Sequence, residues 1–357
     1  MKRLVAAALL ISLVCGLLSG CDLWMDGYYV SVEPHTEQNF HAEKEVVEIT
    51  SNSQLRQALV ELVEKGAESG IISVATFNQT TAYVQMDSAI RSVKNNHPVG
   101  VYAVEDITYE IGNADGTAAI AVSIVYRRDY SQVLRIKKAA TVGEAEDHIY
   151  AALLDVEPSV AIRLTEDIEL DCEQIVRTYA AANPDIVIEI PEITIRSYPE
   201  DAKDRIVEVV FAYRTSRESL RQMQEQVATV FTSAQLYVQS ETQVREKYIQ
   251  LYNFLMERFE YTFESSVTPA YSLLHDGIGD GPAFATVYAA MCRKAGMECH
   301  VITGYREGEP WTWNMIYYMG GYYHLDLLIC NQSGGFAVNR QSEITEYDWD
   351  KSAYPSR

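Results

Sequence analysis

Apolar residues recur with two different periods along the chain, and the points where the period changes predict its elements. Leucines at helical spacing predict a helix over about 53–65, and the apolar run after it predicts a strand at Gly70–Phe77. A second helix is expected to continue to about Lys94. Two strands are then expected in succession, at Val99–Ile111 and Ala118–Arg128.

The same order of elements is predicted again in the next hundred residues. A helix is expected at Val142–Leu154, a strand at Val160–Leu164 and a second helix at Cys172–Ala182. Two strands follow, at Asp185–Tyr198 and Asp204–Thr215. The pattern therefore favours two α-β-α-β-β modules in tandem, at residues 49–140 and 141–236.

An internal repeat supports this pairing. Four residues recur at an offset of 86 positions, namely Pro98, Val101, Ile107 and Thr108 as Pro184, Val187, Ile193 and Thr194. The alternative is a chance likeness between two amphipathic hairpins. Neither module contains a histidine, cysteine or paired-acid constellation that suggests a reaction, so we expect the modules to bind or to space rather than to catalyse.

The N-terminus has the three-part pattern of a secretory signal. Lys2 and Arg3 precede the uncharged apolar run Leu4–Leu18, which is too short to span a bilayer comfortably. Leu18-Ser19-Gly20-Cys21 resembles the lipobox of bacterial lipoproteins, which implies cleavage before Cys21 and a diacylglycerol on its thiol. We therefore expect a signal peptide at 1–20, a spacer at 21–48 and an extracytoplasmic protein lipid-anchored to the bacterial cell membrane. The alternative is an ordinary signal peptide with Cys21 as a bystander.

Composition narrows the classes of partner. A net charge of −21 repels nucleic acid, and no basic stripe exists to neutralise phosphates. The four cysteines beyond residue 21 are too scattered for a disulfide scaffold, and no cysteine or histidine cluster has metal-ligand spacing. We expect no metal and no cofactor.

The pattern changes in the last third of the chain, where three segments carry a family resemblance. An amphipathic helix is predicted at Arg245–Tyr261, ahead of these segments. They are GDGPAFATVYAAMCRKAG (279–296), ECHVITGY (298–305) and PWTWNMIYYMGGYYHLDL (310–327), and the tail EYDWDKSAYP (346–355) fits the same pattern. Together they resemble the transglutaminase-like superfamily of papain-like cysteine enzymes. The resemblance implies an α+β domain at 237–357, and so an α+β chain of two modules followed by this domain.

The resemblance also implies where catalytic residues would stand. In this family a cysteine at a helix N-terminus is the nucleophile, a strand histidine is the base, and an aspartate orients the histidine. The matching positions are Gly281 for the cysteine, Trp311 for the histidine and Asp326 for the retained aspartate. Glycine has no nucleophile and an indole is no base, so we expect no cysteine-type catalysis.

Other residues could use or fill the altered cleft. His275 or His324 could pair with Asp326 in rerouted chemistry, and Cys330 is expected four residues past Asp326 on the same strand. A Cys292–Cys299 disulfide is left open. The expected ligand groove, against the simpler expectation of plain packing, consists of Trp311, Trp313, Tyr323, Asp326 and His275.

Three hypotheses on function follow. The leading one is a surface lipoprotein whose inactive transglutaminase-like domain binds or scaffolds at the envelope, with a cell-wall component, a peptide or a protein as ligand. The alternative is a hydrolase or peptidase with rerouted catalytic residues. The third is a purely structural role for the two modules.

Overall fold

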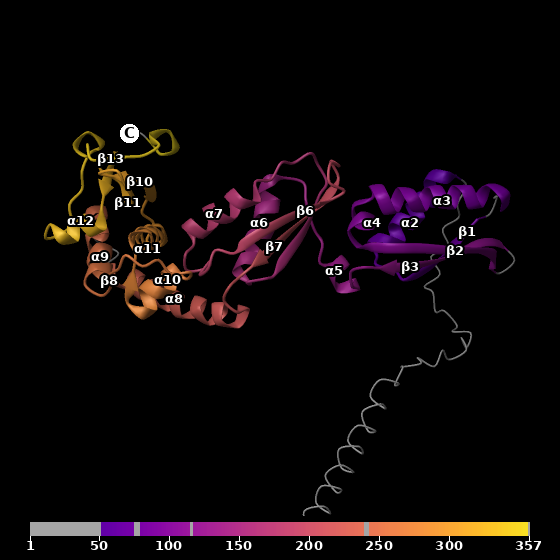
Figure 1. Cartoon of the computed structure of the whole chain (residues 1–357), viewed down its shortest axis with the longest axis horizontal. Coiled ribbons are helices and arrows are strands. Elements are labelled where there is room, and N and C mark those ends of the chain that lie inside the picture. Colours follow the sequence, from indigo (N-terminus) through magenta and orange to yellow (C-terminus); the bar gives the residue numbers. More distant parts are fainter. Residues whose placement is uncertain (1–50, 75–78, 115–116, 239–242, 356–357) are drawn as a thin grey trace, which may run out of the picture. The chain divides into compact units, whose positions relative to one another are not determined.

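The computed structural model describes residues 51–74, 79–114, 117–238 and 243–355. The predicted signal peptide, the lipid site Cys21 and the spacer 21–48 all lie outside these residues. Within the described ranges, no helix combines the length and the apolar character that a membrane span needs. The described chain is a mixture of helices and sheets (Figure 1).

The first module forms a three-stranded antiparallel sheet covered by helices. Its elements are α2 (Asn52–Glu64), β1 (Ser69–Ser73), α3 (Gln79–Asn96), β2 (Val104–Ala114) and β3 (Thr117–Tyr126). Strand β3 is central, with β1 and β2 on either side. Apolar side chains of α2 and α3 pack on the sheet in one buried cluster.

The strand predicted from Val99 is wrong over its first five residues. The chain forms the short helix α4 (Pro98–Ala103), and β2 begins only at Val104. Pro98 suits the first turn of a helix because it needs no N–H partner there. Gly100 lets α4 lie against the end of α3, since a Cβ at Gly100 would stand 2.0 Å from the carbonyl oxygen of Val93.

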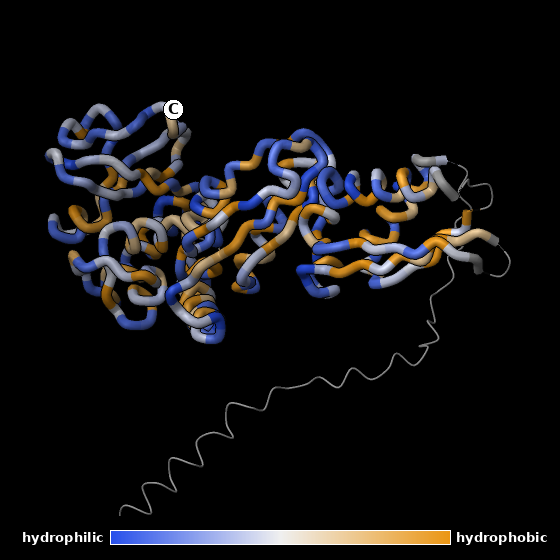
Figure 2. Tube along the Cα trace, turned by 45° about the vertical axis from the view of Figure 1, so that its right-hand side comes forward, coloured by the Kyte–Doolittle hydropathy of each residue, from blue (hydrophilic) through white to orange (hydrophobic). Residues whose placement is uncertain are grey.

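The second module repeats this arrangement with one added strand. Its elements are β4 (Lys137–Ala139), α6 (Val142–Leu154), β5 (Ser159–Leu164), α7 (Cys172–Ala182), β6 (Glu192–Tyr198) and β7 (Arg205–Ala212), and the short α5 (Tyr130–Leu134) precedes them. Strand β4 falls within the range predicted for the first module, but it pairs with β5. The sheet order is β4-β5-β7-β6, and Figure 2 shows hydrophobic segments along these strands. In both modules the last strand pairs antiparallel with the other two strands of the shared motif. That the modules arose by duplication stays a prediction.

The strand predicted from Asp185 is also too long. Residues 185–191 are irregular, and β6 begins at Glu192. Val187 and Ile188 are buried although they pair with no strand. Their apolar character indicated burial, and the pattern alone could not distinguish a buried loop from a strand.

The last part of the chain begins with a helical layer. It contains α8 (Arg217–Tyr237), α9 (Val244–Met256), α10 (Pro269–Tyr271), a π-helical turn (Ser272–Asp276) and α11 (Gly281–Lys294). The helix predicted through Tyr261 ends at Met256, and Glu260–Tyr261 form β8, which pairs with β9 (Ile278–Gly279). Helix α8 falls within the range predicted for the second module, but its buried residues belong to the same cluster as those of α9 and α11.

A four-stranded antiparallel sheet completes this part. Its order is β12-β11-β10-β13, with β10 (Cys299–Arg306), β11 (Glu309–Tyr318), β12 (Gly321–Leu325) and β13 (Tyr347–Asp348). Short turns of 3₁₀ helix lie at Gln341–Glu343 and Lys351–Ala353. Helix α12 (Leu327–Gln332) follows β12 directly, so the expectation that Cys330 continues the strand is wrong. Asp326 is the N-cap of this helix.

Candidate functional site

The start of α11 is built as a helix N-terminus without a reactive side chain. Asp280 caps it, because its Oδ1 accepts a hydrogen bond from the Ala283 N–H at 2.9 Å. Its Oδ2 accepts one from the Ser265 hydroxyl at 2.6 Å. Gly281 is the first helical residue, and a Cβ built on it would meet only Leu328 Cδ1 within 4 Å, at 3.5 Å. The position where the family carries cysteine therefore has room for a side chain.

Asp326 is a buried carboxylate with four hydrogen-bond donors. Its Oδ1 accepts from the backbone N–H groups of Leu328 (3.1 Å) and Ile329 (3.0 Å), which caps α12. Its Oδ2 accepts from Trp311 Nε1 at 2.6 Å and from the Tyr347 hydroxyl at 2.9 Å. Only 9 % of the residue is exposed. Four donors satisfy most of what an ionised carboxylate can accept, which is what a buried charge requires.

Trp311, the position that the resemblance assigns to histidine, thus donates its indole N–H to Asp326. The indole N–H is a donor only, so Trp311 can hold the carboxylate but can neither take nor return a proton at neutral pH. The guanidinium of Arg306 lies over the ring of Trp311 at 6.0 Å and over that of Tyr347 at 5.7 Å. The Asp326 carboxylate is therefore hydrogen-bonded by two aromatic side chains, and the guanidinium of Arg306 lies over both of their rings.

The pKa shifts of two neighbouring tyrosines agree with a charged carboxylate at this site. Burial raises the pKa of Tyr347, and the charge of Asp326 raises it further, so the phenol stays a hydrogen-bond donor. Burial raises the pKa of Tyr261 too, with added contributions from the charges of Asp280 and Asp326. The contacts show the same neighbourhood, because a Cβ on Gly281 would lie 3.5 Å from Leu328 Cδ1, and Asp326 bonds both the Leu328 N–H and Trp311.

Asn314 connects the sheet to the helix behind it. Its side chain is fully buried, and Nδ2 donates to the backbone carbonyls of Ala285 on α11 (2.8 Å) and His300 on β10 (3.4 Å). Asn314 on β11 therefore links α11 to the sheet through these two hydrogen bonds.

The other residues of the expected groove have partners other than Asp326. Trp313 is buried and donates its indole N–H to His324 Nδ1 at 3.0 Å. Tyr323 packs against Tyr318, with ring centroids 4.6 Å apart. His275 is half exposed and bonds Asp276 at 2.8 Å. Of the five groove residues, the structure brings only Trp311 and Asp326 into hydrogen-bond contact.

Neither candidate base contacts the retained aspartate. Among the described residues, the side-chain hydrogen bonds of His275 and His324 go to Asp276 and Trp313, not to Asp326. Burial and the charge of Lys351 lower the pKa of His324 to about 4, so its ring is neutral at pH 7. His275 also stacks on Tyr271 at 4.5 Å.

The described cysteines are free and buried. Burial and a hydrogen bond with Cys299 raise the pKa of the Cys292 thiol well above its usual value, which disfavours a reactive thiolate. Within the described residues, no three histidine, cysteine, aspartate or glutamate side chains are placed to hold a metal ion.

Comparison with known proteins places the resemblance on this part of the chain. Residues 232–327 match the family model of the transglutaminase-like superfamily. The chain contains a transglutaminase-like domain. No curated protein matches the chain.

Several solved structures are similar at low identity. A proposed cysteine protease from Cytophaga hutchinsonii is 13 % identical, with 44 % of this chain and 70 % of that chain covered and a TM-score of 0.27. A TGase is 11 % identical, with 69 % and 68 % covered and a TM-score of 0.28. A proposed protease from Parabacteroides distasonis is 8 % identical, with 72 % and 40 % covered and a TM-score of 0.24. Likenesses this distant carry no argument about chemistry, which depends on the residues of this transglutaminase-like domain itself.

Two residues of the Asp326 site were missed from sequence. Tyr347 lies in the tail that resembles the family, but nothing in EYDWDKSAYP indicates that its first tyrosine reaches a carboxylate 21 positions earlier. Arg306 ends β10 and showed no motif. The contacts of Tyr347, with Arg306 included, depend on β13 pairing with β10, a long-range pairing that local pattern does not predict.

Proposed function

We propose that this protein is a lipid-anchored envelope protein whose transglutaminase-like domain binds a partner instead of catalysing a reaction. The proposed ligand is a cell-wall component, a peptide or a protein at the outer face of the bacterial membrane. The proposed anchor is a diacylglycerol on Cys21, after cleavage of residues 1–20.

The hydrogen bond from Trp311 Nε1 to Asp326 is the observation that carries this proposal. The indole holds the carboxylate that a catalytic histidine would need, and Gly281 offers no nucleophile. A rerouted reaction would need a base within hydrogen-bond reach of Asp326. The two histidines considered for that role have other partners.

An activity assay with one variant tests the proposal. The purified chain is incubated with amide and peptide substrates, and both hydrolysis and cross-linking are followed. We expect no turnover above the blank, and no change with Asp326→Asn. Turnover by the wild-type chain that Asp326→Asn abolishes would establish the hydrolase instead.

The anchor is tested separately from the domain. The wild-type chain is expected in the membrane fraction of a bacterial host, with a mass that includes the lipid. Cys21→Ser is expected to remove the lipid mass and to prevent cleavage before residue 21. Cys15→Ser, a change of the same type inside the signal run, is the control and is expected to change neither property. If Cys21→Ser leaves mass and fractionation unchanged, Cys21 is not the anchor.

A further inference from the structure

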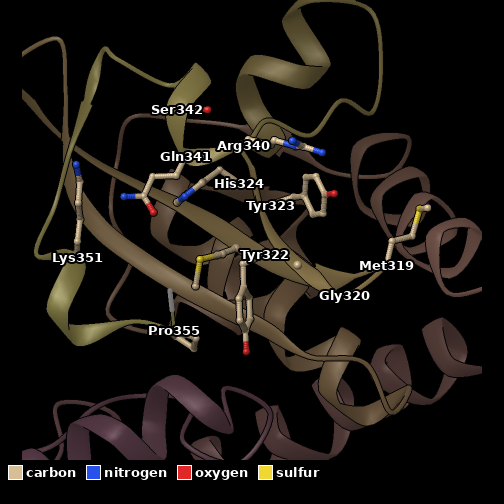
Figure 3. A pocket seen from close by; sticks show the side chains of 12 residues that line it. Met319, Gly320, Tyr322, Tyr323, His324, Arg340, Gln341, Ser342, Lys351 and Pro355 are labelled. Carbon is tan, nitrogen blue, oxygen red and sulfur yellow. The ribbon is translucent and has the colours of Figure 1, made fainter. Parts of the chain in front are cut away.

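A second site lies in the transglutaminase-like domain, along β12 at the edge of the sheet. Ile316 packs in the cluster that contains α11, whereas the preceding residue Met315 packs in a separate cluster with Trp313. Successive strand residues point to opposite faces, so Met315 and its cross-strand partner His324 face away from α11. A pocket of about 710 Å³ opens along β12 and is lined by Met315 and His324 from this face and by Tyr323 from the other (Figure 3). Its volume lies within the usual range for a small-molecule site.

The pocket is cationic in a strongly acidic chain. Arg340 and Lys351 line it, and no aspartate or glutamate does. Within the described ranges, neither cation forms an ion pair with a carboxylate, although the chain carries a net charge of −21. The ammonium of Lys351 instead lies 5.0 Å from the ring centroid of Trp349. Two cations without counter-charges favour an anionic ligand.

His324 contributes a buried donor whose orientation is fixed. Its Nδ1 accepts the Trp313 indole N–H at 3.0 Å, so in the neutral ring the proton is on Nε2. The residue is only 4 % exposed and lines the pocket, and within the described ranges no side-chain hydrogen bond to Nε2 occurs. A neutral N–H held in this way presents a donor to an oxygen of a ligand.

The remaining walls are polar on one side and apolar on another. Gln341 lies near His324 and Lys351, whereas Met319 and the ring of Tyr323 lie across the pocket (Figure 3). Amide and hydroxyl groups such as those of Gln341 and Ser342 suit sugar hydroxyls, and an aromatic ring suits the apolar face of a sugar.

We propose that this pocket binds a sugar that carries a carboxylate. Lys351 and Arg340 would attract the carboxylate, His324 Nε2–H would donate to a ligand oxygen, and Gln341 and Ser342 would bond hydroxyls. The proposal does not depend on whether the Asp326 site is inactive, because Asp326 and its partners Trp311 and Tyr347 do not line the pocket.

Calorimetric titration of the full-length chain with glucuronate, glucose and inorganic phosphate tests the proposal. Glucuronate is expected to bind, glucose to bind at least about 10-fold more weakly, which corresponds to about 1.4 kcal/mol, and phosphate more weakly than glucuronate. Lys351→Met and Arg340→Met should each weaken glucuronate binding, by a factor on the order of 10 for Lys351→Met. Both residues are exposed, so the variants should keep the wild-type fold.

Lys203→Met is the matched control, because it removes the same charge from an exposed lysine that pairs with Asp167 at 3.2 Å in the second module. Its glucuronate affinity is expected to equal that of the wild-type chain. Absence of glucuronate binding overturns the proposal, and so does equal weakening by Lys203→Met. Glucose or phosphate binding as tight as glucuronate binding overturns the assignment of ligand class.

Discussion

Replacing Trp311 by phenylalanine should destabilise the transglutaminase-like domain mainly through its effect on Asp326. The change removes a 2.6 Å hydrogen bond to a carboxylate that is 9 % exposed. Hydrogen bonds to charged groups contribute about 1.5–3 kcal/mol, and a buried charge that loses a donor bears its desolvation cost. The smaller ring also loses packing, because Trp311 is partly buried against two apolar clusters.

A double-mutant cycle separates these two contributions. Asp326→Asn keeps an oxygen to accept from Leu328 N and Ile329 N, so the cap of α12 remains, but it removes the charge. In that background the amide NH2 replaces the oxygen that accepted from the indole N–H, so two donors face each other and Trp311→Phe should cost no more than the packing contribution. The coupling free energy between Trp311 and Asp326 should therefore be about 1.5 kcal/mol or more.

Urea unfolding followed by tryptophan fluorescence measures the cycle. Of the four tryptophans, Trp311, Trp313 and Trp349 belong to this domain, so the signal reports on its unfolding. Tyr347→Phe serves as the control, because it removes the other hydrogen bond to the same oxygen of Asp326 and keeps the aromatic ring. It should show coupling with Asp326→Asn as well. If Trp311→Phe costs as much in the Asp326→Asn background as in the wild-type chain, the indole does not stabilise the charge and the reasoning fails.

Three further results are expected. Gly281→Cys should change the free energy of unfolding by less than about 1 kcal/mol, because the site has room and glycine is a poor helix former. The added thiol should be alkylated faster than the buried Cys292, and a rate no faster than that of Cys292 would contradict its placement at the helix N-terminus. The pKa of His324 is about 4 in the folded chain and near 6.5 in the unfolded chain, so the free energy of unfolding should fall as the pH falls from 6.5 to 4, by roughly 3 kcal/mol at most, and should lose nothing more from this residue below pH 4. Thermal unfolding of His324→Asn should depend less on pH in that window. Tyr248→Phe removes an O–H that donates to the carbonyls of Glu298 (2.6 Å) and Tyr317 (3.1 Å) and should cost about 1–3 kcal/mol in urea, whereas an unchanged midpoint would mean that water replaces the hydroxyl.

Sequence pattern predicted the elements best where local signals coincided. The helices Val142–Leu154 and Cys172–Ala182 were predicted at the residues where they occur, because a capping side chain precedes each apolar stripe. The strands from Val99 and Asp185 were drawn too long, because buried apolar residues before a strand resemble the strand itself.

The candidate site likewise contains residues that the sequence indicated and residues that it did not. The transglutaminase-like domain is confirmed at residues 232–327, whereas the roles assigned to Gly281, Trp311 and Asp326 from their motif positions stay predictions. Tyr347, and the pocket lined by Arg340 and Lys351, were not predicted from sequence. They form where the chain after α12 folds back across the sheet, and that packing leaves no local period.

The four donors around Asp326 give this carboxylate a use that does not require a histidine. One oxygen begins α12 and the other holds Tyr347, so a single side chain fastens the C-terminal tail to the sheet. Lys351 follows four residues after Tyr347 and forms part of the pocket wall. Loss of the hydrogen bond between Tyr347 and Asp326 would therefore loosen that wall, and we expect proteases to cleave the C-terminal tail before the rest of the domain. Asp326 would then serve as the fastener of the C-terminal tail and of the pocket wall that the tail carries.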